Sequence, residues 1–336
     1  MKNQTYIIIT ILLLVVMGTF IYIGCGKKDH DSGSSSTVKA VDDYVWVSNR
    51  SSGNVTRILK SNPATTTTIA VGAGPEGVAV DETYVWVANG GSNNVSRIQK
   101  SNPAISTTIA VGTGPVGIAV DETYCWVANN GSNNVFRIQK SNPAISTTIA
   151  VGTLPVGIAV DATYCWVANQ GSNNVFRIQK SNPAISTTIA VEKPCGVAVD
   201  ETYCWVANNG YGYVTLNYVT RIQKSDPAIS TTIVVGDGPY GIAVDETYCW
   251  VSNQATGNVT RILKSNPATT TTIAVGAGPG GVAVDETYCW VANNTSDNAT
   301  RIVKSTSVTT TIGVGDYPYS IGDMTGYAYD HYANKP

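Results

Sequence analysis

The chain has 336 residues, of which 13% are charged, and its 21 basic and 23 acidic side chains give a formal net charge of −2. This near-neutral balance argues against the basic surface of a nucleic-acid-binding protein, so we expect no nucleic-acid partner. The two histidines, His30 and His331, both lie near the chain ends, which leaves little basis for histidine catalysis or a histidine-rich metal site.

The first segment is an apolar run from Tyr6 to Ile23. It is long for the core of a signal peptide and short for a membrane-spanning helix. The Gly24-Cys25 pair at its end resembles a bacterial lipobox, with Tyr22 at a position that is usually leucine. We predict cleavage before Cys25 and lipidation of its thiol. An uncleaved membrane helix and ordinary secretion are the alternatives.

This leader predicts the cellular location of the protein and the nature of its first two segments. Residues 1–24 are then a signal peptide or membrane segment, and residues 25–37 a lipid-anchored flexible linker rich in glycine and serine. The remainder, residues 38–336, is expected outside the cytoplasmic membrane, in the cell envelope. It would be tied to the membrane through the lipid or the N-terminal helix.

Residues 38–336 hold one motif in seven copies, whose tryptophans are spaced by 40, 40, 40, 39, 45 and 40 residues. These are Trp46, Trp86, Trp126, Trp166, Trp205, Trp250 and Trp290. Each copy has four runs rich in Val, Ile, Thr, Tyr or Trp, bounded by Gly, Pro, Asn or Asp, as in 117–120, 124–128, 134–139 and 146–151. Four strands in about 40 residues are typical of a propeller blade. The sequence therefore predicts an all-β fold, a seven-bladed β-propeller of four-stranded antiparallel blades.

The two ends of the repeat region predict how the ring closes. The first copy lacks the Gly-Pro-x-Gly lead-in to its inner strand, which we place at Lys39 to Val41. After the seventh copy the pattern restarts at 317–321 and is interrupted by Gly322 and Asp323. We predict that this C-terminal closure segment, residues 316–336, lies beside the N-terminal strands.

Three stretches of the repeat carry a resemblance to known proteins. They are Tyr-x-Trp-Val-Ala-Asn, as in 84–89, Asn-Val-x-Arg-Ile, as in 94–98, and the stretch from Thr-Ile-Ala-Val-Gly to Val-Ala-Val-Asp, as in 68–81. Over roughly residues 40–325 the chain resembles the YVTN family of β-propeller repeats and, in form, the virginiamycin B (streptogramin) lyases. The resemblance implies the fold and an exported or surface-anchored protein. Those lyases use a catalytic histidine with a metal-binding glutamate, and no copy here contains a histidine, so it implies no lyase activity.

Some positions are the same in nearly every copy and are interpreted as structural. The aspartate that ends the first strand, such as Asp121, is expected to cap backbone N–H groups of the next turn. The arginine of the third strand, such as Arg137, is expected to reach a carboxylate or carbonyl of a neighbouring blade. Five cysteines precede tryptophans where the first two copies have Val45 and Val85, so we predict buried free thiols.

Variation gathers at the x of Pro-x-Gly and in the loop after the second strand. In an up-and-down blade both places lie on one face of the ring, here called the variable face. The Asp-Glu-Thr and Lys-Ser-Asn-Pro turns lie on the opposite, constant face. Loops that vary on a rigid scaffold are typical of binding sites. Cys195 is also on the variable face and is a candidate reactive thiol.

Tyrosines dominate the candidate ligand site. A tyrosine offers a flat apolar ring and a hydroxyl, which suit sugars or peptide partners. Packing of the aromatic side chains against the rim is the alternative. The candidate residues are Tyr211, Tyr213 and Tyr218 from the long fifth loop, and Glu76, Tyr240 and Tyr319 from the x positions.

Together these features predict a non-catalytic binding and interaction scaffold at the cell envelope, with a protein or glycan partner. No catalytic residue, metal ligand or cofactor is predicted, because the repeats offer only scattered Asp, Glu and Tyr. Two alternatives stay open. One is a lyase-like or hydrolytic enzyme acting at the central face. The other is a self-assembling surface-layer component, which near-identical copies would favour.

Overall fold

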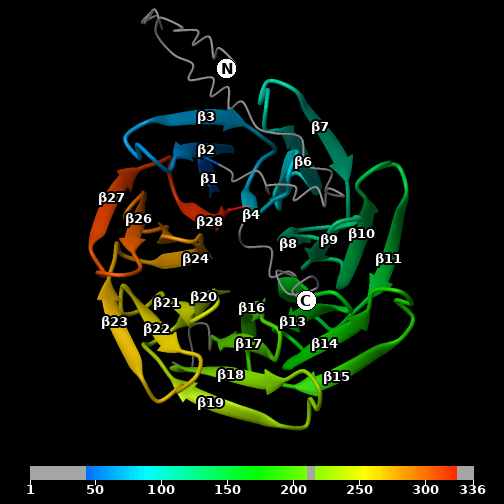
Figure 1. The fold of residues 1–336 in the computed structure, drawn as a ribbon. Coiled ribbons are helices and arrows are strands. Elements are labelled where there is room, and N and C mark those ends of the chain that lie inside the picture. Colours follow the sequence, from blue (N-terminus) through cyan, green and yellow to red (C-terminus); the bar gives the residue numbers. More distant parts are fainter. Residues whose placement is uncertain (1–42, 210–215, 324–336) are drawn as a thin grey trace, which may run out of the picture. The chain divides into compact units, whose positions relative to one another are not determined.

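The computed structural model describes residues 43–209 and 216–323, which form 28 β-strands in seven four-stranded antiparallel sheets. The sheets stand as blades around a common axis (Figure 1). The predicted seven-bladed β-propeller is therefore confirmed. Within the described ranges no helix is long and apolar enough to cross a membrane. The apolar run from Tyr6 to Ile23, with Cys25, lies outside these ranges.

The strands of each blade keep the same order from the axis outward. The innermost strands are β4 (Pro75–Val80), β8 (Pro115–Val120), β12 (Pro155–Val160), β16 (Pro194–Val199), β20 (Pro239–Val244), β24 (Pro279–Val284) and β28 (Pro318–Gly322). The second strands are β1 (Tyr44–Asn49), β5 (Tyr84–Asn89), β9 (Tyr124–Asn129), β13 (Tyr164–Asn169), β17 (Tyr203–Asn208), β21 (Tyr248–Asn253) and β25 (Tyr288–Asn293). Contacts between successive innermost strands close the ring.

The third and fourth strands complete each blade toward its rim. The third strands are β2 (Asn54–Leu59), β6 (Asn94–Gln99), β10 (Asn134–Gln139), β14 (Asn174–Gln179), β18 (Tyr218–Gln223), β22 (Asn258–Leu263) and β26 (Asn298–Val303). The fourth strands are β3 (Thr66–Ala70), β7 (Ser106–Ala110), β11 (Ser146–Ala150), β15 (Ser186–Ala190), β19 (Ser230–Val234), β23 (Thr270–Ala274) and β27 (Thr309–Gly313). The fourth strands are mostly exposed, which explains their threonine-rich, half-polar sequence.

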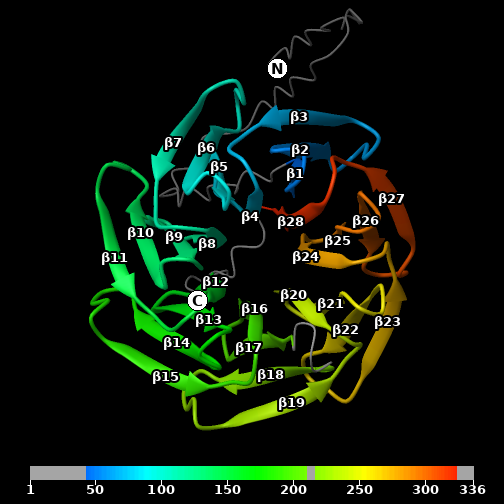
Figure 2. The same ribbon diagram turned by 180° about the vertical axis from the view of Figure 1, so that it is seen from behind.

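Blade one is completed by the end of the repeat region. Strand β28 pairs antiparallel with β1, so that Val47 faces Ile321 and Asn49 faces Pro318. Figure 2 shows β28 inside β1 at the axis. The expected position of the chain's end beside its N-terminal strands agrees with this pairing. The inner strand of blade one was expected at Lys39 to Val41, and this was wrong, because β28 takes the innermost position beside β1. Residues 39–41, and residues 324–336 of the closure segment, lie outside the described residues.

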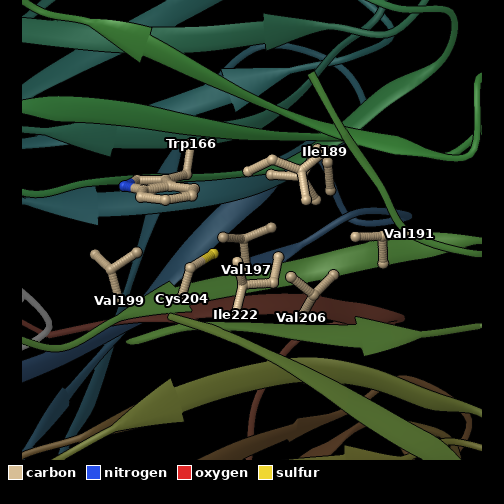
Figure 3. Close-up of a cluster of buried hydrophobic side chains, with 10 residues drawn as sticks. Trp166, Ile189, Val191, Val197, Val199, Cys204, Val206 and Ile222 are labelled. Atoms are coloured by element: carbon tan, nitrogen blue, oxygen red, sulfur yellow. The ribbon is translucent and has the colours of Figure 1, made fainter. Parts of the chain in front are cut away.

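The apolar core lies between neighbouring blades. In one such layer Trp166 and Ile189 of blade four face Cys204, Val206 and Ile222 of blade five (Figure 3). The residue before each tryptophan is therefore small, because the tryptophan of the preceding blade packs over it. All six cysteines of the described residues are free and buried, which confirms the prediction for the five that precede tryptophans.

The constant face is held by polar bonds that join the blades. Asp121 Oδ1 accepts from the backbone N–H groups of Thr123 (2.9 Å) and Tyr124 (2.7 Å), which confirms the predicted cap. Its Oδ2 accepts from Trp126 Nε1 (3.0 Å) and pairs with Lys180 Nζ of the next blade (3.0 Å). The same ion pairs are Lys140–Asp81, Lys224–Asp161, Lys264–Asp200 and Lys304–Asp245.

The repeated arginines also bridge blades. Arg137 Nη1 donates to the carbonyl of Lys180 (3.1 Å), so the carbonyl is the partner found for the predicted contact. The guanidinium lies 4.5 Å from the ring centre of Tyr124. The partner of the aspartate, the lysine of the Lys-Ser-Asn-Pro turn, was not predicted.

Candidate functional site

The first turn of each inner strand shapes the variable face. Pro75 faces Asn89 and Val78 faces Val87, so Glu76 and Gly77 together oppose one residue of β5. Such bulges re-aim side chains and recur beside functional sites. A Cβ on Gly77 would collide with the carbonyl of Val116 in the next blade, so the glycine is required by a close approach. The x residues consequently follow one another around the inner ring.

An ion pair joins blades one and two at this ring. Arg50, which directly follows β1, donates from Nε to Oε1 of Glu76 (3.1 Å). The Glu76 side chain is 10% exposed and that of Arg50 is 48% exposed. Burial raises the pKa of the Glu76 carboxyl, and the charge and hydrogen bond of Arg50 oppose this rise. The pair thus presents a half-exposed cation beside a sheltered carboxyl.

Aromatic rings surround the arginine. Its guanidinium carbon lies 5.8 Å from the ring centre of Tyr319 and 6.0 Å from that of Tyr317, at cation–π distance. The Tyr319 hydroxyl hydrogen-bonds to that of Tyr240, and the two rings meet edge to face with centres 5.9 Å apart. Tyr240 belongs to β20 and Tyr319 to β28, with β24 of blade seven between them.

Blade seven carries Gly280 at its x position, so no side chain separates the two tyrosines. A Cβ there would lie 2.7 Å from the carbonyl oxygen of Tyr319. On its other side Tyr240 forms a side-chain hydrogen bond with Cys195. The result is a continuous row of interacting groups, here called the polar arc: Cys195, Tyr240, Tyr319, Arg50 and Glu76.

A cavity of about 460 Å³ adjoins the polar arc at blades one to three. This volume falls within the roughly 300–1,000 Å³ of small-molecule sites. The lining residues are Arg50, Ser51, Gly74, Glu76, Gly90, Gly91, Gly114, Val116 and Asn130. The cavity therefore combines one ion pair, an amide and a hydroxyl with a floor of glycine backbone.

The structure brings three of the predicted site residues, Glu76, Tyr240 and Tyr319, into the polar arc. Tyr218 is held elsewhere, because its hydroxyl donates to Glu192 Oε2 (2.8 Å). Partial burial, then the hydrogen bond to Glu192 and its charge, raise the pKa of Tyr218 to about 12. Tyr211 and Tyr213 lie outside the described residues.

Cys195 lacks the features of a reactive thiol. It is 1% exposed, and burial raises the pKa of its thiol to about 12, with weaker opposition from bonds to Gly196 and Tyr240. Reactive cysteines are accessible and have lowered pKa values. The structure thus assigns Cys195 a place in packing the polar arc.

Arg50 was not predicted as a site residue, and Tyr317 was noted near Tyr319 but left out of the predicted site, although both break the pattern of the repeat. Arg50 stands where later copies have glycine, asparagine or glutamine. Tyr317 has a φ of 53° at the position before proline, where four blades have glycine with φ between 59° and 67°. A side chain in this left-handed region costs about 1–2 kcal/mol. Backbone strain of this kind clusters at functional sites.

Across residues 43–209 and 216–323, no three His, Cys, Asp or Glu side chains gather closely enough to hold a metal ion. Glu76, the acidic group of the arc, is paired with Arg50. The arrangement offers hydrogen bonds, charge and aromatic surface to a ligand.

Comparison with known proteins identifies the fold. No protein-family model and no curated protein matches the sequence. Virginiamycin B lyase from Staphylococcus aureus is similar in structure, with 17% identity and a TM-score of 0.64 over 73% of this chain and 87% of the lyase. Hydrazine synthase from Kuenenia stuttgartiensis has 20% identity and a TM-score of 0.69, over 82% of this chain and 99% of the hydrazine synthase chain. AztD from Citrobacter koseri has 11% identity and a TM-score of 0.60, over 83% of this chain and 97% of AztD.

These similar structures bear names of unlike functions on one architecture, and their identities to this chain are low. A shared propeller does not carry function with it. The likeness to the virginiamycin B lyases that the repeat implied is thus found in three dimensions, and it shows the seven-bladed β-propeller fold.

Proposed function

We propose that the protein is a non-catalytic binding scaffold of the cell envelope, which recognises a glycan or protein through its variable face. The polar arc carries the proposal. It gathers unlike groups from blades one, two, five and six on one face, with a cavity beside it. Recognition needs such a combination of aromatic, charged and hydrogen-bonding groups in one place.

The division of labour between the two faces supports this proposal. On the constant face the aspartates and lysines are bonded to neighbouring blades, and these bonds repeat with the same residues. On the variable face the repeat is broken at Arg50, Glu76, Tyr317 and Tyr319. Because these bonds on the constant face join the blades, the residues of the variable face can differ from blade to blade without loss of the scaffold. Preformed sites of this kind bind with little change of backbone.

The envelope location rests on the leader sequence. The run from Tyr6 to Ile23 followed by Cys25 supports export and lipid attachment. Replacing Cys25 by serine should abolish incorporation of labelled fatty acid into the protein and release it from the membrane fraction. A protein that stays in the membrane fraction without lipid would favour the uncleaved helix.

Retention on isolated cell envelope tests the scaffold itself. The full chain, purified in mild detergent, is compared with an Arg50→Gln, Tyr319→Phe double variant, in which glutamine is the residue of blades four and six and phenylalanine keeps the ring. The matched control is Glu122→Gln, Glu246→Gln on the constant face, where both side chains are exposed. We expect the first variant to lose retention and the control to keep it.

Equal retention of both variants would place recognition away from the polar arc. Digesting the envelope with protease, or separately with glycan hydrolases, names the class of partner. Metal-dependent turnover of envelope material would favour the enzyme alternative. Assembly that grows with concentration and needs no envelope would favour the surface-layer alternative.

A further inference from the structure

We propose that the cavity beside Arg50 binds a neutral sugar unit of an envelope glycan, with Glu76 accepting from and Arg50 donating to neighbouring ring hydroxyls. This inference rests on the proposed function, because it names the ligand of the variable face. It is carried by a side chain missing from blade two, by the hydrogen-bonding capacity of the ion pair, and by the glycine floor.

The cavity is lined by a glycine at a position where five other blades carry an amide side chain. The residue directly after the second strand is Asn130, Gln170, Asn209, Gln254 or Asn294 in blades three to seven, but Gly90 in blade two. Asn130 Nδ2 donates to the carbonyl of Pro155 in the following blade (3.2 Å). A Cβ on Gly90 would lie 3.2 Å from the equivalent carbonyl, that of Pro115, and 3.0 Å from Glu76 Oε1. Blade two therefore lacks the amide side chain of blades three to seven, and the Glu76 carboxylate lies beside that place at the edge of the cavity.

The ion pair at this opening suits hydroxyl groups better than ions. Among the side-chain atoms of Arg50 and Glu76, only Nε and Oε1 are bonded within the described residues. The Nη donors and Oε2 remain for a ligand. The opposite charges of Arg50 and Glu76 cancel, so the pair attracts neither an anion nor a cation overall. A hydroxyl both donates and accepts, so a pair of adjacent hydroxyls matches an acceptor and a donor set side by side.

The walls favour a compact ring over an extended peptide. The N–H groups of Gly90 and Gly91 already donate to the carbonyls of Gly74 (2.8 Å) and Ala73 (3.0 Å). They are unavailable for the backbone bonds by which a peptide strand adds to a sheet. Glycine backbone and Val116 line the cavity and offer a small apolar surface to the C–H face of a sugar. The guanidinium that also lines it lies at cation–π distance from Tyr317 and Tyr319.

The test fills the cavity with the residue that the repeat itself uses. Full-length protein in detergent is titrated calorimetrically with neutral disaccharides (maltose, cellobiose, lactose and chitobiose), with a uronic-acid disaccharide, and with a tetrapeptide. Gly90→Asn places the asparagine of blade three into the cavity. Gln170→Asn makes the same residue at the same position of blade four and is the matched control. Glu76→Gln removes the charged acceptor while keeping its shape.

We expect at least one neutral disaccharide to bind the wild type and Gln170→Asn equally. Gly90→Asn and Glu76→Gln should each weaken that binding by about tenfold or more, as loss of a hydrogen bond to a charged group does. Circular dichroism of Gly90→Asn checks that the blade is intact.

Three results would overturn the sugar assignment: no binding of any neutral disaccharide, preference for the uronic acid or the peptide, or full binding by folded Gly90→Asn. Envelope retention, measured on the same preparations, separates the two proposals. Retention through the polar arc without sugar binding defeats only the ligand assignment. Absence of retention by the wild type defeats the scaffold as well.

Discussion

At the scale of single residues, the carboxylate of Asp121 accepts several of the hydrogen bonds that stabilise a blade. Burial raises its pKa most, but the charge of Lys180 and the hydrogen bonds from Tyr124, Lys180 and Trp126 together outweigh burial, and the pKa falls below its usual 3.8. An acid whose pKa is lowered by folding stabilises the fold above the unfolded value. That stabilisation is lost as the pH falls through the folded value.

We predict that Asp121→Asn lowers the free energy of unfolding by about 2–4 kcal/mol at neutral pH, because the indole and the ammonium lose a charged acceptor. The difference from wild type should shrink as the pH falls below 3.8, because the unfolded wild type then takes up a proton at Asp121, and it should vanish once the folded protein is protonated there at a still lower pH. Denaturant unfolding at several pH values measures both effects.

Asp226→Asn is the control for this substitution. It places an asparagine where five other copies have one, at an exposed turn, and should change stability by no more than about 0.5 kcal/mol. A neutral effect of Asp121→Asn would show that the inter-blade network contributes nothing.

Two residues on the variable face should limit stability. Tyr317 and Leu154 have φ values of 53° and 50° where other blades have glycine. Replacing Leu154 by glycine should raise the unfolding free energy by up to about 1 kcal/mol, because relief of left-handed strain exceeds the added entropy of the unfolded chain. Tyr317→Gly should gain less, since it also loses the contact with Arg50. Thermal unfolding of both variants measures this, and a marked loss at Leu154→Gly would contradict it.

At the scale of strands, β28 is the element whose removal should matter most. A chain that ends after Gly315 leaves the inner edge of β1 unpaired and removes Pro318 and Ile321, both buried. We expect the free energy of unfolding to fall by at least about 3 kcal/mol, since burying one large apolar side chain contributes roughly 1.5–3 kcal/mol. Calorimetry compares this chain with one that ends after Asp323 and keeps β28. Equal midpoints would mean that blade one needs only three strands.

The strands could be predicted from the sequence because the signal is copied seven times. Each copy repeats the same β-branched runs and the same turn residues, so local errors cancel. The contacts of the site could not be predicted in this way. That Glu76 and Arg50 share a face follows from the topology, but their ion pair depends on side-chain direction across two blades.

Other parts of the site show the same limit. Tyr240 and Tyr319 meet only because blade seven has Gly280 between them, which is a fact about three blades at once. Tyr218 was predicted to face a ligand, and its bond to Glu192 depends on the shortened connection into β16. The lysines of the constant face recur in every copy of the sequence, yet their recurrence does not identify the aspartate of another blade with which each one pairs.

At the scale of the whole molecule, the packing of blades against one another should protect the thiols. The five cysteines that precede tryptophans are fully buried, and burial raises their pKa well above the ordinary value. With Cys25 replaced by serine, we expect the native protein to leave these thiols unlabelled by an aromatic disulfide reagent at mildly alkaline pH. Labelling should follow only on addition of denaturant. Rapid labelling of Cys204 before unfolding would show that blades four and five part readily.

The pairing of β28 with β1 also orders events in time. Synthesis delivers β1 among the first strands and β28 last of those described, so the earliest sheet is the final one to be finished. Until β28 is made, the inner edge of β1 is unpaired and can pair with another strand, including strands of the six similar copies that follow it. A chain cut short by a stalled ribosome or by proteolysis can never supply the missing strand. The ring is therefore closed only in a chain that extends through β28, and a shorter chain keeps an unpaired edge at β1.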